Sequence, residues 1–121
     1  MGLIKLLLVD DEEDFVTTLA QRLNMRNYHT MIATSGKDAL AEIQKERPDI
    51  VLLDLKMPVM DGLEVLARIK AADPSIKVIM LTGQGDVKSG EKAKKAGALG
   101  YLVKPFDIDI LLSTLKDLDQ K

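Results

Sequence analysis

Five polar residues stand at the ends of short apolar runs in this sequence: Asp10, Asp11, Asp54, Thr82 and Lys104. Carboxylates that lie close together repel one another and raise one another's pKa values. A hard divalent cation such as Mg²⁺ relieves that repulsion, because it prefers oxygen ligands. A carboxylate beside such a cation can accept a phosphoryl group as an aspartyl phosphate. A hydroxyl and an ammonium would then stabilise the charge on the phosphoryl oxygens.

The elements that would position these residues alternate along the chain. Five apolar runs are separated by longer stretches with helical spacing, and the runs cover residues 3–9, 31–33, 50–53, 78–81 and 101–103. The first run is broken only by Lys5, and nearly continuous apolar runs of this length are typical of strands buried on both faces. The alternation predicts an α/β fold with a parallel sheet and right-handed crossovers. We expect a flavodoxin-like, doubly wound three-layer sandwich with five strands in the order 2-1-3-4-5 and five helices.

Helix start signals support this assignment at two positions. Ser35 and Asp61 each precede a helical pattern, and an acidic residue follows each of them three positions later (Asp38 and Glu64). The stretch 86–95 is the weakest predicted helix, because it contains a glycine and few apolar residues.

In an open parallel sheet the ligand crevice lies at the carboxyl ends of the strands. With the expected strand order, the five polar residues converge on one pocket, and Asp54 ends the central strand, so we assign it as the acceptor. Taken singly, each residue has an ordinary explanation as a turn former, a helix cap or a solvated lysine. Their coincidence at one sheet edge favours a site. Glu12 and its two acidic neighbours are interpreted only as stabilising a helix N-terminus.

Composition limits the remaining functions. The chain has 121 residues, so we expect a single domain over 1–121. It has no cysteine, which excludes disulfides and thiolate sites and fits a cytoplasmic location. A net charge of −2 offers no basic surface for nucleic acid or for a membrane. Neither a secretion signal nor a long apolar span is present in the sequence.

The ordered motifs closely resemble those of the receiver domains of two-component response regulators, and the resemblance covers essentially the whole chain. The matching motifs are Val9-Asp10-Asp11, Leu53-Asp54 followed by Met57-Pro58 and Asp61-Gly62, Leu81-Thr82-Gly83, and the run from Tyr101 to Pro105.

This resemblance implies that Asp54 takes a phosphoryl group from a histidine of a sensor kinase or a histidine phosphotransfer protein. Mg²⁺, or another divalent cation such as Mn²⁺, would be bound directly by Asp11 and Asp54, through water by Asp10, and by the backbone carbonyl of Lys56. The protein would catalyse only its own phosphoryl transfer and dephosphorylation, and would not otherwise be an enzyme.

The resemblance also implies a switch. Thr82 would move towards the phosphoryl group, Tyr101 would turn inward, and the Lys104–Pro105 bond would be cis. The surface of the fourth helix, fifth strand and fifth helix would then control a partner, an output domain missing from this chain, or a dimer that forms on phosphorylation.

Two further positions would tune the lifetime of the phosphorylated state, namely Lys56 and Gln84. Neither side chain is a carboxylate, so neither would serve as a strong general base for the attacking water.

Three alternatives remain open at this point. A haloacid-dehalogenase-like phosphatase would place its nucleophile after the first strand, where Asp10 and Glu12 match only roughly. A receiver-like binding module would work without phosphate. A flavin-binding module is the weakest alternative, because the first loop is acidic and only 3% of the residues are aromatic.

The remaining candidates have simpler interpretations. His29 is expected on the surface before an edge strand, without an acidic partner. A basic run in the fourth helix is interpreted as a solvated face, with an acidic partner as the alternative. Ile110 lies off the apolar stripe of the last helix and is either an isolated surface residue or part of an output face.

Overall fold

A computed structural model describes residues 3–119 of the chain. Its five strands form one parallel sheet in the order β2-β1-β3-β4-β5. The predicted architecture and strand order are therefore confirmed. The strands are β1 (Ile4–Val9), β2 (Tyr28–Ala33), β3 (Ile50–Asp54), β4 (Lys77–Thr82) and β5 (Gly100–Val103).

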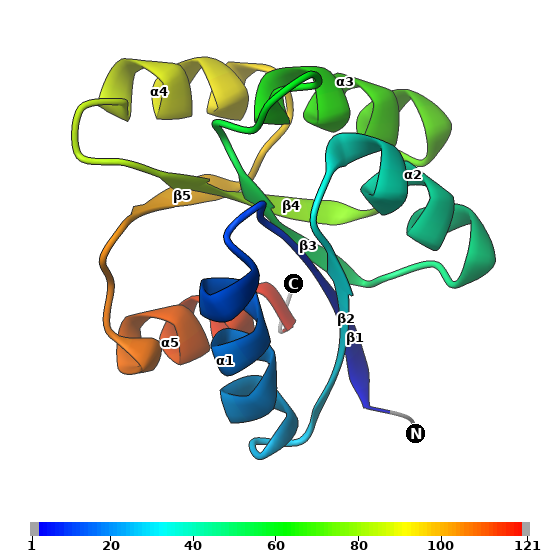
Figure 1. Cartoon of the computed structure of the whole chain (residues 1–121), viewed down its shortest axis with the longest axis vertical. Coiled ribbons are helices and arrows are strands. Elements are labelled where there is room, and N and C mark those ends of the chain that lie inside the picture. The colour runs from blue at the N-terminus through cyan, green and yellow to red at the C-terminus, as the bar shows by residue number, and fades with distance from the viewer. Residues whose placement is uncertain (1–2, 120–121) are drawn as a thin grey trace.

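Five helices cover the sheet on both faces (Figure 1), with α1 and α5 on one face and α2, α3 and α4 on the other. The sheet therefore lies between two separate apolar cores. The helices are α1 (Glu13–Asn24), α2 (Gly36–Lys45), α3 (Gly62–Ala72), α4 (Val87–Lys95) and α5 (Ile108–Asp119).

Alternate residues of a strand enter opposite cores, as the pleat of a strand requires. In β1, Leu7 and Val9 pack towards α2 and α3, whereas Leu6 and Leu8 pack towards α1 and α5. All four side chains are buried. This explains why the three central strands have continuous apolar segments at 6–9, 50–53 and 78–81, since neither face of these segments meets water.

The predicted helix start signals are confirmed. The Ser35 hydroxyl accepts a hydrogen bond from the Asp38 backbone N–H at 3.1 Å, and the Asp61 carboxylate accepts one from the Glu64 N–H at 3.0 Å. The weak fourth helix forms as well, over Val87–Lys95, although Asp86 at its N-cap makes no capping bond.

The prediction for His29 was wrong in two respects. His29 lies within β2 instead of before it, and its Nε2 is 3.5 Å from Oε2 of Glu46. The cause is the parallel pairing of β2 with β1, which sets His29 beside Lys5. Both basic side chains therefore reach the same carboxylate after α2, since Lys5 Nζ lies 3.2 Å from Glu46.

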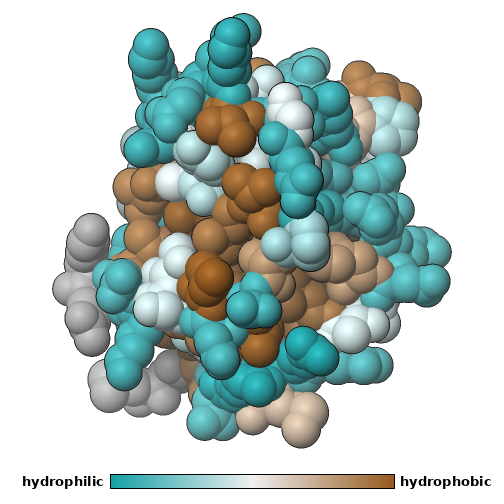
Figure 2. All heavy atoms as spheres, turned by 90° about the vertical axis from the view of Figure 1, so that its left-hand side faces the viewer, coloured by the Kyte–Doolittle hydropathy of each residue, from teal (hydrophilic) through white to brown (hydrophobic). Residues whose placement is uncertain are grey.

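The strand β5 forms one edge of the sheet, and all four of its residues are only partly buried. The molecule viewed from the side of α4, β5 and α5 carries apolar residues in the middle of that face, between polar ones (Figure 2). The exposed Ile110 of α5 is 51% accessible. Within residues 3–119, no helix has the length and apolar character needed to span a bilayer.

Candidate functional site

The polar residues singled out in the sequence lie at the carboxyl edge of the sheet. Asp10 follows β1, Asp54 is the last residue of β3, Thr82 is the last residue of β4, and Lys104 follows β5. The parallel arrangement brings these strand ends to the same edge, on both sides of the switch point between β1 and β3.

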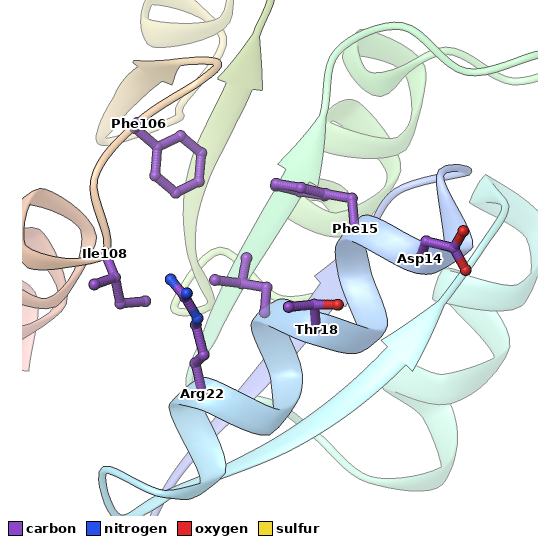
Figure 3. A pocket seen from close by; sticks show the side chains of 7 residues that line it. Asp14, Phe15, Thr18, Arg22, Phe106 and Ile108 are labelled. Carbon is purple, nitrogen blue, oxygen red and sulfur yellow. The ribbon is translucent and has the colours of Figure 1, made fainter.

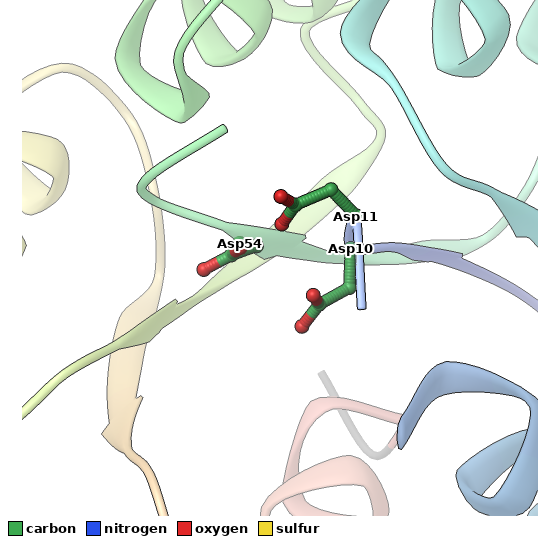
Figure 4. A group of neighbouring side chains, drawn as sticks. All are labelled: Asp10, Asp11 and Asp54. Atoms are coloured by element: carbon green, nitrogen blue, oxygen red, sulfur yellow. The ribbon is translucent and has the colours of Figure 1, made fainter. Parts of the chain in front are cut away.

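Three carboxylates form a cluster there (Figure 4). Asp10, Asp11 and Asp54 each offer an oxygen, and these oxygens all lie within 4.8 Å of one another. Asp10 and Asp54 are buried, whereas Asp11 is exposed to solvent. The cluster supplies only oxygen donors and opens to water on one side, so its chemistry fits a hard cation that keeps part of its hydration.

The ammonium of Lys104 neutralises part of this negative charge. Its Nζ lies 2.6 Å from Asp10 Oδ2, 3.2 Å from Glu12 Oε1 and 3.7 Å from Asp54 Oδ1. Burial acts to lower the pKa of Lys104, but its hydrogen bond to Asp10 and the surrounding carboxylate charges outweigh that effect, and the pKa is raised. The lysine therefore stays charged beside the cluster.

The backbone holds this lysine in place. The Lys104 N–H donates to the Thr82 carbonyl at 2.7 Å, which continues the pairing of β5 with β4. The following Lys104–Pro105 peptide bond is cis. The pairing of β5 with β4 places Lys104 at the sheet edge, and its side chain extends towards Asp10 after β1 and Asp54 at the end of β3.

Asp54 is difficult to ionise in the absence of a cation. Its burial is the largest cause and the charge of Asp10 the next, and together with Asp11 they raise its pKa to about 7 against the opposing effect of Lys104. The expected effect of neighbouring carboxylates on a pKa is thus present at Asp54. A divalent cation would remove much of this penalty, because it supplies positive charge at the same position.

Glu12 belongs to the site, and its interpretation as a helix-terminus residue alone was incomplete. Its backbone N–H donates to Asp10 Oδ1 at 2.9 Å, and its side chain reaches Lys104. The spacing of Asp10 and Glu12 by two residues, in a segment that precedes α1, is the signal that could have indicated that both side chains approach the Lys104 ammonium.

A hollow of about 380 Å³ opens in front of the cluster. Lys56 and Asp86 face each other at this hollow, with Lys56 Nζ 3.1 Å from Asp86 Oδ1. The hollow is lined by Asp11, Glu12, Asp54, Lys56, Gly83, Asp86 and Lys104.

Thr82 and Tyr101 lie outside this lining. Thr82 is fully buried, and its hydroxyl is 3.5 Å from the carbonyl of Leu102 on the neighbouring strand. The Tyr101 ring packs against Gly90 of α4, where a Cβ would lie only 2.9 Å from the ring. Its hydroxyl donates to Glu91 Oε1 at 3.2 Å. Gln84 is exposed.

The family model described as the response regulator receiver domain matches residues 6–116. The chain is 43% identical to sporulation initiation phosphotransferase F of Bacillus subtilis, over 93% of this chain and 90% of that protein. It is 42% identical to the transcriptional regulatory protein ZraR of Salmonella typhimurium, over 95% of this chain but only 26% of that protein.

Solved structures agree with these matches. The receiver domain of NtrX from Brucella abortus superposes with a TM-score of 0.90 and 32% identity, covering 93% of this chain and 96% of that one. A CheY-like receiver domain protein from Methanospirillum hungatei gives a TM-score of 0.92 and 32% identity, covering 98% and 96%. These matches support the receiver over the phosphatase and flavin-binding alternatives. The chain therefore belongs to the family of response regulator receiver domains.

Proposed function

We propose that Asp54 is the phosphoacceptor of this receiver domain and takes its phosphoryl group from a phosphohistidine of a sensor kinase or phosphotransfer protein. The observation that carries the proposal is the carboxylate cluster with the ammonium of Lys104 held 3.7 Å from Asp54. Asp11 and Asp54 would bind Mg²⁺ directly, Asp10 through water, and Lys56 through its backbone carbonyl.

In the transfer, a carboxylate oxygen of Asp54 forms a bond to phosphorus while the bond between phosphorus and the donor imidazole breaks. The electron pair of the broken bond returns to the imidazole nitrogen. The positive charge of Lys104 would stabilise the negative charge that develops on the phosphoryl oxygens. The Thr82 hydroxyl would donate a hydrogen bond to one of these oxygens. Bound Mg²⁺ would supply further charge neutralisation to the carboxylate and the phosphoryl oxygens.

Phosphorylation adds nearly two negative charges and three acceptor oxygens at Asp54. Thr82 would leave the Leu102 carbonyl for these oxygens and so vacate space beside β5. Tyr101 would then leave Gly90 and turn into that space, which changes the surface formed by α4, β5 and α5. The phosphoryl group would bias a pre-existing equilibrium between two states of the domain. Lys56 and Gln84 would tune the lifetime of the phosphorylated state.

The chain spans 90% of one relative but about a quarter of the transcriptional regulators that it matches. We propose that residues 1–121 act as one receiver, either alone or as the receiver part of a longer regulator, in the cytoplasm. The apolar residues on the face in Figure 2 would contact the target, the attached effector or a second copy.

The test is the intact mass of the protein after incubation with acetyl phosphate, with and without Mg²⁺. One added phosphoryl group that requires both Mg²⁺ and Asp54 supports the proposal, so Asp54→Asn must abolish it. Asp49→Asn is the matched control, because Asp49 is an exposed carboxylate that precedes β3 at its opposite end.

Other outcomes separate the alternatives. Absence of an adduct together with release of inorganic phosphate indicates rapid hydrolysis at Asp54, provided that Asp54→Asn stops the release. Absence of both overturns the proposal in favour of a binding module that works without phosphate. Steady turnover of a phosphomonoester would instead indicate a phosphatase.

A second experiment isolates the role of Lys104. Lys104→Ala should still bind Mg²⁺, since the three carboxylates remain, but it should label slowly or fail to change its amide spectrum on labelling. Normal labelling with a normal spectral change would contradict that role.

A further inference from the structure

The ammonium of Lys104 has an aromatic neighbour besides the carboxylates. Its Nζ lies 4.7 Å from the ring centroid of Phe15 and is positioned over that ring. Phe15 is the third residue of α1, so the ring approaches the lysine from a different element than β5. An ammonium over the face of an aromatic ring is attracted by the negative charge density of that face.

A second aromatic residue supports the ring. Phe106 lies two residues after Lys104 and meets Phe15 edge to face, with centroids 6.2 Å apart and ring planes at 87°. Both rings line a hollow between α1 and the start of α5 (Figure 3), which has a volume of about 440 Å³. Both rings are partly buried, so contact with one another limits their freedom to move.

The ring differs from the other neighbours of the ammonium in one respect. Asp10 and Asp54 belong to the cluster that would bind the divalent cation, and Glu12 is 66% exposed, so water screens its charge. When a cation neutralises the buried carboxylates, their attraction for Lys104 weakens. The attraction of the Phe15 ring does not change, because the ring is not a ligand.

We infer that Phe15 is a positioning residue for phosphoryl transfer, which keeps the Lys104 ammonium beside Asp54 when the metal is bound. This inference rests on the proposed function of Asp54. Phe106 assists by holding the Phe15 ring. The helical stripe that Phe15 shares with Leu19 and Leu23 accounts for burial of those leucines, but not for a ring placed over a charged lysine at the start of α1.

The test replaces Phe15 by phenylalanines with one, two and three ring fluorines. Fluorine withdraws charge from the ring face while the ring keeps nearly the same shape. We expect the rate of labelling by acetyl phosphate at saturating Mg²⁺ to fall step by step, by about two- to fivefold in total. The Mg²⁺ concentration for half-maximal rate and the thermal midpoint should stay unchanged.

The matched control carries the same fluorinated phenylalanines at position 28 and is compared with Tyr28→Phe, because Tyr28 begins β2 at the end of the sheet opposite the site. Labelling rates there should remain within experimental error of the rate of Tyr28→Phe. For conventional variants, Phe15→Leu should lower the rate and Phe15→Tyr should restore it, since tyrosine retains an aromatic face. Equal rates for all fluorinated proteins at position 15 would overturn the inference.

The position of the lysine can be read directly by NMR. A ring current from Phe15 should shift the Lys104 ε-methylene protons upfield, and the shift should persist after Mg²⁺ is added. Its loss on Mg²⁺ addition would show that the ammonium leaves the ring and would contradict the inference. If the proposed function of Asp54 fails, the unmodified protein forms no adduct and releases no phosphate. If only the inference on Phe15 fails, the unmodified protein is still labelled at Asp54.

Discussion

Lys56 and Asp86 form an ion pair of 3.1 Å at the hollow in front of Asp54, and this pair joins the loop after β3 to the start of α4. The Asp86 side chain is only 19% exposed, whereas that of Lys56 is 74% exposed. The lysine stem therefore extends along the opening towards a partly enclosed carboxylate. The pair therefore borders the hollow from which water would attack a phosphoryl group on Asp54.

Asp86→Asn should shorten the lifetime of the phosphorylated state, because it frees the Lys56 side chain to leave the opening. A partly exposed ion pair contributes up to about 1 kcal/mol, which corresponds to a rate increase of up to about fivefold. Loss of the mass adduct over time measures the effect. Lys88→Gln, at an exposed lysine of α4, is the control. Equal lifetimes for Asp86→Asn and the unmodified protein would contradict the prediction.

Stability without metal should fall as pH rises, because Asp54 ionises less readily in the folded chain. The pKa of Asp54 is about 7 in the folded chain, and its ordinary value of 3.8 represents the unfolded chain. Between pH 3.8 and about pH 7 the folded state therefore binds more protons than the unfolded state. Asp54→Asn should remove this loss. Its free energy of unfolding should exceed that of the unmodified protein by at most about 4 kcal/mol at pH 8, and by less at pH 5.

Urea unfolding in EDTA at both pH values measures this difference. A stability gain of Asp54→Asn that is equal at pH 5 and pH 8 would mean that titration of Asp54 is not its cause.

Mg²⁺ affinity should depend on each carboxylate of the cluster. Asp11→Ala should weaken binding by at least about tenfold, since even groups outside the first coordination shell have effects of that size. Asp10→Asn should weaken it less if Asp10 binds through water. Asp38→Asn, on the exposed side of α2, should leave affinity unchanged. Calorimetric titration distinguishes these cases, and equal affinities for all four proteins would argue against this metal site.

Gly90→Ala should displace the Tyr101 ring, because the added Cβ would lie 2.9 Å from it. Alanine is otherwise favoured over glycine within a helix by about 1 kcal/mol. That gain should appear only in a Tyr101→Ala background, where the ring is absent. Thermal unfolding of the unmodified protein, the two single variants and the double variant gives the coupling energy between positions 90 and 101. An equal stability gain from Gly90→Ala in both backgrounds would show that packing of the Tyr101 ring does not require glycine at position 90.

Val59→Gly should stabilise the protein. Val59 has a φ of 70°, a left-handed conformation that costs a β-branched residue about 1–2 kcal/mol, and its side chain is fully exposed. Glycine removes this cost but loses more entropy on folding, which leaves a net gain of about 0.5–1 kcal/mol. The control is Val87→Gly, at an exposed valine with helical backbone in α4, which should destabilise. Destabilisation by both variants would exclude strain at Val59.

The sequence sufficed to predict the fold because most residues of the central strands are buried on both faces, which leaves a nearly continuous apolar run in each strand. It also predicted that Asp10, Asp54 and Lys104 meet, since parallel strands bring their carboxyl ends to one edge of a sheet. The helix caps at Ser35 and Asp61 are local interactions, and local sequence was enough to find them.

Contacts between distant side chains could not be predicted in this way. The approach of Lys104 to Phe15, the pair of Lys56 with Asp86, and the pair of His29 with Glu46 depend on side-chain rotamers and loop paths. Each links residues from different elements, and neither periodicity nor a neighbouring residue carries a signal for it.

The sheet separates the two ends of the proposed switch. Lys104 lies beside α1, whereas Tyr101 packs against α4, which covers the opposite face. A phosphodonor that contacts α1 and a target that contacts α4 alone would therefore bind on opposite faces of the sheet. If Asp54 is phosphorylated as proposed, such a donor and such a target would form a ternary complex, in which the target responds before the donor has dissociated.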